Sequence, residues 1–416
     1  MPATRVKRET TKSDAVRKQT SALVHDQTRD PGRTAGAPTA ALPVMAKGKG
    51  GTVTDVDGNE YIDLDGGSCT LLLGHADERV VAAITKAAAK GHGFSGPSES
   101  MVRLAELIIS RFPSIETLRL AVTPAEAQAT AVRLARANVG KPEIVVCERR
   151  STERATYTTD EDALARDRFR SVPYNDIAAA TRAFAEADGG VAALMVEPVA
   201  TSIGLVPPLD GYLARLRVLC DEHAAALIFD ETRTGLRLGP GGAAGLFGVT
   251  PDMTCLGGSL SAGLPLAAVG GRKDLILNSA SGVGPADAQP AGTELAVAAA
   301  LTCLQATAEP GIYEQLDETT ALVDKGLSDV TTGMATFQTR VCSMLGLFFS
   351  GSPVTNGASA LKTDSARYTR FHRALLDAGV LIPASPHRPW CVSTAHTTEQ
   401  IERAIDAVAT ALAKSA

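Results

Sequence analysis

Two carboxylic acids follow apolar runs that have the composition of buried β-strands. The run AAALIF ends at Asp230, and the run ALMV is followed by Glu197 within the sequence VEPV. Ligands of open α/β sheets bind beyond the carboxyl ends of the strands, and two carboxylates that face one crevice can share acid–base work. We therefore predict that Asp230 and Glu197 are catalytic residues.

A further short strand, MTCL, is expected soon after Asp230, and it ends in Gly257, Gly258 and Ser259. Cys255 lies in this strand, beside the candidate site. It is either a nucleophile or a small buried apolar residue, and the second role is the commoner one for an isolated cysteine. We predict the second role for Cys255.

The elements that must position these residues alternate between strand and helix. Apolar runs begin at Leu118, Ile144, Ala193 and Ala225, and amphipathic segments of helical spacing lie between them. Strands separated by helical patterns of this length predict βαβ units and a mainly parallel sheet, so the fold class is α/β. We divide the chain into a flexible N-terminal segment (1–40), a part that packs with the small domain (41–85), a large α/β domain (86–305) and a small C-terminal domain (306–416).

Composition excludes several classes of partner. The 416 residues carry a net charge of −5, with 44% hydrophobic and 21% charged residues, so we expect neither nucleic acid nor a membrane as partner. The N-terminus lacks the apolar core of a secretory signal, which predicts a cytoplasmic protein. Seven scattered cysteines without a CxxC motif predict reduced thiols and no metal site.

Several motifs resemble those of class III, fold-type I, pyridoxal-phosphate (PLP) aminotransferases, and most closely the glutamate-1-semialdehyde 2,1-aminomutases. They are DETRTG from Asp230, the hairpin DVDGNEYID at 55–63, and the C-terminal segments LLDAGVLIPAS and STAHTTEQIERAI. The resemblance runs from about residue 50 to the C-terminus. It implies a fold-type I large domain, a smaller α/β C-terminal domain, and a homodimer with the site near the subunit interface.

The same resemblance implies that the residue which defines the family's chemistry is missing. In the family, the acid of DETRTG holds the pyridinium nitrogen of the cofactor, and a lysine in T-L-G-K forms the Schiff base. Here the frame reads TCLGG, so Gly258 occupies the lysine position. The nearest downstream lysine is Lys273, which we expect at the far end of the next strand and not in the site.

The family's phosphate-binding motif has also changed. Where the family reads S-G-T-E-A at a helix N-terminus, this chain has Thr123, Pro124, Ala125, Glu126 and Ala127. Pro124 has no N–H to donate to a phosphate. A threonine that reaches the phosphate from the neighbouring subunit aligns near Gln289, and Thr293 takes its place only if a gap is introduced.

The ring-stacking aromatic residue of the family aligns with Ser151 and Thr152, and an aromatic residue of the substrate pocket aligns with Ser68. Arg149 and Arg150 precede the first pair. These two arginines either lie in a solvated loop, or they point inward and bind an anionic substrate. The resulting prediction for the substrate-binding residues is Thr123, Ser151, Thr152, Ser68, Gly258 and Ser259.

The lysine, the phosphate cradle and the stacking group all serve one ligand, so their joint loss predicts that no cofactor is used, or that PLP binds only noncovalently. We expect a divergent, PLP-independent enzyme of specialised biosynthesis that acts on a small molecule. One alternative is a catalytically inactive partner or scaffold of an aminotransferase. Another is a PLP-dependent aminotransferase or aminomutase with a substitute lysine.

Overall fold

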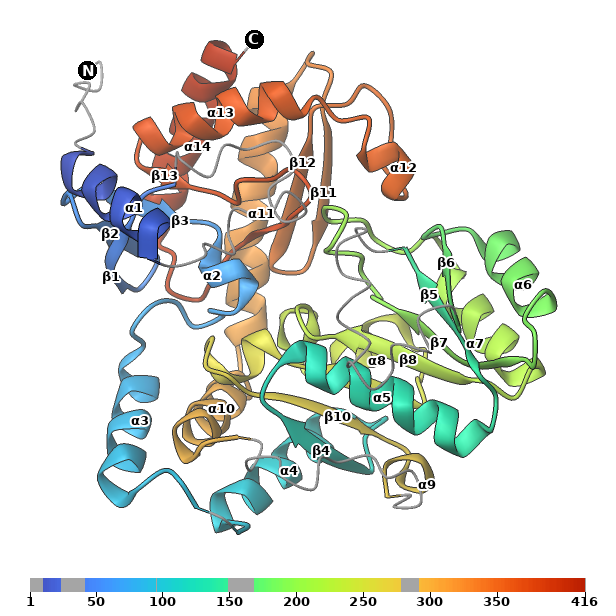
Figure 1. Cartoon of the computed structure of the whole chain (residues 1–416). Coiled ribbons are helices and arrows are strands. Elements are labelled where there is room, and N and C mark those ends of the chain that lie inside the picture. The colour runs from blue at the N-terminus through green and yellow to red at the C-terminus, as the bar shows by residue number, and fades with distance from the viewer. Residues whose placement is uncertain (1–9, 24–41, 95, 149–167, 278–291, 416) are drawn as a thin grey trace.

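The structure is a computed structural model that describes residues 10–23, 42–94, 96–148, 168–277 and 292–415. It contains a larger unit built around a seven-stranded sheet and a smaller unit that combines the C-terminal part of the chain with its N-terminal strands (Figure 1). The predicted α/β fold class is confirmed.

The large sheet has the strand order β4-β10-β9-β8-β7-β5-β6. Within it, β10 runs antiparallel to both of its neighbours, and the other strands run parallel to one another. The neighbouring strands β5, β7 and β8 are buried along their whole length, which explains the apolar runs in their sequence. The strands are β4 (Thr117–Ala121), β5 (Glu143–Cys147), β6 (Phe169–Val172), β7 (Val191–Val196), β8 (Ala226–Glu231), β9 (Met253–Leu256) and β10 (Ala267–Gly271).

Helices cover both faces of this sheet. Helix α5 (Pro124–Val139) packs through its alanines and Val132 on the face that carries Ile228 and Cys255. Helices α6 (Ile177–Ala185) and α7 (Tyr212–Glu222) pack on the opposite face, against Phe229. Further helices flank the unit: α3 (Glu78–Lys90), α4 (Glu99–Arg111), α8 (Gly242–Phe247), α9 (Lys273–Ile276) and α10 (Glu294–Ala306).

The smaller unit joins the two ends of the described chain. Its four-stranded sheet has the order β1-β2-β3-β13, and β13 (Val380–Leu381) pairs in parallel with β3. A three-stranded sheet of order β11-β12-β14 lies beside it. The remaining elements are β1 (Met45–Lys49), β2 (Thr52–Asp55), β3 (Glu60–Asp63), β11 (Phe337–Val341), β12 (Met344–Phe348), β14 (Trp390–Cys391), α2 (Gly66–Cys69), α11 (Ile312–Thr331), α12 (Gly357–Ala360), α13 (Ser365–Asp377) and α14 (Thr398–Ser415).

Two features of this unit differ from the sequence analysis. Residues Thr11–Leu23 form helix α1, which was not predicted; the backbone N–H groups of Lys12 and Ser13 donate to the carboxylate of Asp57. The prediction that all thiols are reduced is wrong for one pair, because Cys69 and Cys391 form a disulfide. They are 322 residues apart in the chain, and only the pairing of N-terminal and C-terminal segments in three dimensions brings them together.

Candidate active site at the carboxyl edge of the large sheet

The two predicted acids lie side by side at the carboxyl edge of the sheet. Strands β7 and β8 are parallel neighbours, and their register pairs Val196 with Phe229. Glu197 and Asp230 are the next residues along these strands, so they stand at the same level of the sheet. Both are buried, with 5% and 2% of their surface exposed. The structure therefore brings together the two residues that the sequence analysis selected.

Asp230 is held by donors from two elements. Its Oδ1 accepts hydrogen bonds from the backbone N–H of Thr232 at 3.1 Å and from the Thr232 hydroxyl at 2.7 Å. Its Oδ2 accepts a hydrogen bond from Nε2 of Gln128, on helix α5, at 2.7 Å. Hydrogen bonds to a buried carboxylate offset the cost of its desolvation and fix its orientation.

Glu197 is held by the loop that follows its own strand. Its Oε2 accepts hydrogen bonds from the backbone N–H and the hydroxyl of Thr201, at 2.6 and 2.7 Å, and from the N–H of Ser202 at 3.3 Å. These donors fix the orientation of the carboxyl group beside Asp230.

Gly258 lies at the carboxyl end of β9, the strand next to β8. Its φ is +50°, a left-handed conformation, and a Cβ atom added there would lie 2.8 Å from the carbonyl oxygen of Thr232 and 3.4 Å from the methyl group of Thr70. The backbone at this point is therefore suited to glycine. Lys273 lies at the opposite edge of the sheet, because the register pairs Gly271 with Met253 at the start of β9.

Three buried hydroxyl groups in the loops after β7, β8 and β9 have no hydrogen-bond partner among the described residues. They belong to Ser202, Thr234 and Ser259, whose exposed fractions are 3%, 1% and 2%. Most buried polar groups in proteins are hydrogen-bonded, and an exception often marks a site that a ligand completes. Ser259 was predicted from the sequence to bind substrate, whereas Ser202 and Thr234 were not.

The N-terminus of helix α5 differs from an open phosphate cradle. Thr123 is exposed and caps the helix, because its Oγ1 accepts a hydrogen bond from the N–H of Glu126 at 3.2 Å. The Glu126 carboxylate in turn accepts a hydrogen bond from the N–H of Val122 at 2.8 Å, and Pro124 has no N–H. The chain's own carboxylate thus stands where the helix dipole would attract an anion.

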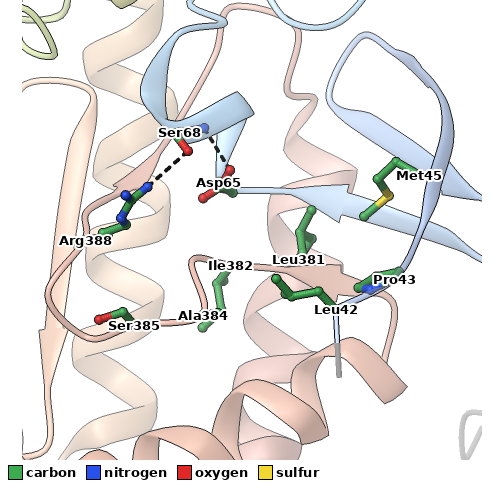
Figure 2. Close-up of a pocket in the computed structure, with 10 residues that line it drawn as sticks. All are labelled: Leu42, Pro43, Met45, Asp65, Ser68, Leu381, Ile382, Ala384, Ser385 and Arg388. Carbon is green, nitrogen blue, oxygen red and sulfur yellow. Dashed lines mark hydrogen bonds between the residues drawn. The ribbon is translucent and has the colours of Figure 1, made fainter. Parts of the chain in front are cut away.

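The other predicted substrate-binding residues are Ser68, Ser151 and Thr152. Ser68 is exposed and lines a cavity of the smaller unit (Figure 2). Ser151 and Thr152, with the neighbouring arginines and Gln289, lie outside the described residues. Thr293 caps α10, where its Oγ1 accepts a hydrogen bond from Ala296. Cys255 is fully buried in β9.

Two further buried polar residues near the site, Gln128 and Glu231, escaped the sequence analysis. Gln128 lies on the buried face of an alanine-rich helix, and a lone amide in that setting is a signal of a polar partner. Glu231 follows Asp230 but points to the other face of the sheet, where its Oε2 accepts a hydrogen bond from the N–H of Ala243 at 2.7 Å. Burial, together with the charge of Asp230, raises the pKa of Glu231 to about 8.

Within the described ranges, no three His, Cys, Asp or Glu side chains are arranged to hold a metal ion. Nor is any described helix both long and apolar enough to cross a bilayer.

Comparison with known proteins places this site in a family. The model of aminotransferase class III matches residues 35–412. The chain belongs to the class-III aminotransferase family. Among curated relatives, glutamate-1-semialdehyde 2,1-aminomutase of Thermomicrobium roseum is 39% identical over 396 residues, which cover 90% of this chain and 92% of the relative. A second such aminomutase, from Brevibacillus brevis, is 38% identical over 392 residues, or 89% and 91% of the two chains.

Solved structures agree with this assignment. An omega-transaminase from Sphaerobacter thermophilus superimposes with a TM-score of 0.87 at 26% identity, over 97% of this chain and 98% of that one. A transaminase with PLP bound superimposes with a TM-score of 0.85 at 25% identity, over 98% of both chains. A lysine-to-alanine variant of a glutamate-1-semialdehyde aminomutase from Pseudomonas aeruginosa, in complex with pyridoxamine phosphate (PMP), superimposes with a TM-score of 0.85 at 23% identity. The match covers 97% of this chain and 95% of that one.

These comparisons contradict the expectation that no cofactor is used. Two of the structural neighbours, both aminotransferase-fold proteins, are complexes with PLP and with PMP. The expectation treated three altered contacts as equivalent to the loss of the whole site. Asp230, which the resemblance aligns with the acid that holds the ring nitrogen, is buried and held by hydrogen bonds, so those three contacts were too few to exclude a cofactor.

Proposed function

We propose that this chain is an enzyme of the aminotransferase family that holds a vitamin B6 cofactor noncovalently, with the ring nitrogen at Asp230. The observation that carries the proposal is the buried Asp230 carboxylate, fixed by Gln128 and Thr232 at the carboxyl edge of the sheet. A buried carboxylate is the group that holds a protonated ring nitrogen. The unpartnered hydroxyls of Ser202, Thr234 and Ser259 supply further polar contacts there.

The fit is good at the ring end of the cofactor and poor at the phosphate end. At the ring end, Asp230 is buried and oriented, and Gly258 has no side chain to occupy the space next to Thr70. At the N-terminus of α5, Pro124 has no N–H to donate to a phosphate, and the N–H of Glu126 is already bonded to the hydroxyl of Thr123. We infer that the phosphate contributes little to binding at this helix.

The PMP-bound lysine-to-alanine variant of the Pseudomonas enzyme supports noncovalent binding, because in that protein the amine form of the cofactor binds without the lysine. When bound, a B6 cofactor supplies an electron sink for a carbanion beside an amine or carbonyl group. In this chain, Asp230 would hold the proton on the ring nitrogen. Glu197, held by Thr201 at the same level of the sheet, is the side chain that we assign to proton transfer.

The test is calorimetric titration of the purified protein with pyridoxamine phosphate (PMP) and with pyridoxamine. We expect both to bind, with dissociation constants that agree to within about threefold, because the phosphate gains little at α5. Asp230→Asn should weaken the binding of both compounds by about ten- to a hundredfold, which corresponds to the loss of one charge-assisted hydrogen bond. Asp210→Asn is the matched control, since Asp210 is exposed in the loop before α7.

A second candidate function is that of a non-catalytic partner of an active aminotransferase. It is favoured by the hydrogen bond from Gln128, which supplies Asp230 with a donor from the chain itself, and by the self-capped N-terminus of α5. The same titration separates the two candidates: the absence of binding by either vitamer would reject the enzyme and retain the partner. A homodimer, a cytoplasmic location and a biosynthetic role remain predictions from the sequence.

A further inference from the structure

The disulfide between Cys69 and Cys391 ties a short left-handed turn to strand β14. All four residues of α2, from Gly66 to Cys69, have a positive φ, between +54° and +70°. Ser68 and Cys69 carry a Cβ atom, and residues with a Cβ atom rarely adopt this conformation. Backbone strain of this kind persists only where the surrounding structure holds it, and it concentrates at functional sites. The disulfide is one of the bonds that hold this turn.

Only one of the two cysteines borders a crevice of the protein. The crevice is narrow and lies beside the turn, and its lining includes Cys69, Ser68 and Pro389 but not Cys391. The exposed fractions agree with this difference, at 4% for Cys69 and 1% for Cys391. A small reductant that approaches through the crevice therefore reaches Cys69 first.

A buried guanidinium lies beside the disulfide. Arg237, in the turn that follows β8, is fully buried. Its Nε donates to the carbonyl oxygen of Cys69 at 2.6 Å, and its Nη1 donates to the carbonyl oxygen of Val392 at 2.8 Å. Asp63 and Asp65 attract this guanidinium electrostatically, but its hydrogen bonds go to neutral oxygen atoms. Nη2 has no hydrogen-bond partner among the described residues.

This unpartnered nitrogen and Cys391 flank the same point of the turn. A Cβ atom added to Gly66 would lie 3.7 Å from Nη2 of Arg237 and 3.5 Å from the Cβ of Cys391. A cation near a sulfur lowers the pKa of its thiol, and a thiol of lower pKa leaves a disulfide faster. Cys391 is therefore the sulfur better suited to leave, and Cys69 is the sulfur that a reductant reaches.

We propose that the Cys69–Cys391 disulfide is a reversible redox site for small thiols, which attack the sulfur of Cys69 while Arg237 stabilises the departing Cys391 thiolate. In the first step, a reductant thiolate forms an S–S bond with Cys69 as the Cys69–Cys391 bond breaks. A second reductant thiolate then attacks the reductant sulfur of this mixed disulfide and releases Cys69 as a thiolate. The protein gains two electrons, the two reductant molecules are joined in a disulfide, and their two thiol protons pass to solvent and to the released sulfurs.

The proposal goes beyond the proposed function, because the exchange needs no cofactor. The redox site and the catalytic edge are neighbours: Thr232, which holds Asp230, precedes Arg237 in one loop, and Thr201, which donates to Glu197, lines the crevice. Reduction would release the strained turn from β14 next to both acids. Thiol exchange is measured without cofactor or turnover, so this proposal and the proposed function can fail separately.

The experiment is reduction of the full, folded chain by 2-mercaptoethanol, with acid quenching, alkylation and peptide mapping by mass spectrometry. We expect a rate that is proportional to thiol concentration and unchanged in urea below the unfolding transition. The mixed disulfide should be trapped on Cys69 at least tenfold more often than on Cys391. A rate that rises with urea in step with the unfolded fraction would overturn the proposal, because the disulfide would then open only on unfolding. A mixed disulfide mainly on Cys391 would overturn it as well.

Arg237→Gln tests the stabilisation of the leaving thiolate. This variant should be reduced at least tenfold more slowly than the wild type, whereas Arg237→Lys, which keeps the charge, should retain most of the rate. Equal rates in the wild type and Arg237→Gln would contradict the proposal.

A second pair of variants guards against misfolding of the Arg237 variants. Ser68→Gly relieves left-handed strain in the oxidised turn, so its disulfide should be about fivefold harder to reduce at equilibrium in a dithiothreitol redox buffer. Ala76→Gly is the matched control, because Ala76 is exposed and has a φ of +50° outside the turn; its equilibrium should be unchanged. A Ser68→Gly disulfide as easily reduced as that of the wild type would overturn the proposal.

Discussion

Gly258 allows the geometry of the site to be tested through stability alone. Its φ of +50° costs a residue with a Cβ atom about 1–2 kcal/mol. The added Cβ of Gly258→Ala would also lie 2.8 Å from the Thr232 carbonyl oxygen, a backbone atom that cannot rotate away. Overpacking of this kind costs about 1–3 kcal/mol. We therefore expect Gly258→Ala to lower the free energy of unfolding by about 2–5 kcal/mol.

Two matched variants separate these contributions. Gly140, the residue that ends α5, has a φ of +70° and no atom within 4 Å of an added Cβ, so Gly140→Ala should show the cost of backbone conformation alone, about 1–2 kcal/mol. Gly93 has neither a positive φ nor a close neighbour, so Gly93→Ala should change stability by less than about 0.5 kcal/mol.

The assay is urea denaturation followed by circular dichroism, with the free-energy change taken from the midpoint shift at constant slope. A Gly258→Ala variant no less stable than Gly140→Ala would refute the reasoning. It would mean that the chain after β9 does not pass as close to Thr232 as the structure shows.

Three further predictions concern the buried groups around the site. Burial raises the pKa of Glu231 from 4.5 in the unfolded chain to about 8 in the folded protein, so the native state loses stability as the pH rises from about 4.5 to 8. Glu231→Gln removes this loss and should stabilise the protein by about 3–5 kcal/mol at pH 8.5 and by almost nothing at pH 4. Denaturation of both proteins at the two pH values measures the difference. Gln128→Ala removes the 2.7 Å hydrogen bond that helps to orient Asp230, so pyridoxamine should raise the melting temperature less in this variant than in the wild type; an equal or larger shift contradicts the positioning of the acid by Gln128. Alkylation of the unfolded, unreduced chain should modify five of the seven cysteines and leave Cys69 and Cys391, whereas modification of all seven would exclude the disulfide.

The large sheet was predictable because the composition of its strands and the spacing between them both indicate a parallel arrangement. The runs that ended at Asp230 and Glu197 are apolar over their whole length, and only a strand buried on both faces has that composition. The spacing between them fixed the parallel connections. From these facts alone the two acids could be placed at one edge, and the register of β7 and β8 bears this out.

The rest of the site depends on contacts between distant segments. The hydrogen bond from Gln128 to Asp230 spans 102 residues, and the disulfide spans 322, so no local pattern contains either pair. The cavity that Ser68 lines needs residues from both ends of the chain. Ser68 was assigned to the substrate pocket by alignment to a single family residue, and that assignment stays a prediction; the structure places Ser68 in a crevice that Thr201 also lines.

The most direct test of the central claim is the absorbance of the purified protein with PLP, followed by borohydride reduction and peptide mapping. Our account predicts a shifted cofactor spectrum that Asp230→Asn abolishes, and no reduced adduct on any lysine of the chain, because Gly258 offers no amine and Lys273 lies at the opposite edge of the sheet. A reduced adduct on a lysine would show covalent binding and contradict the account. An unshifted spectrum would contradict it as well, because Asp230 would then not hold the cofactor.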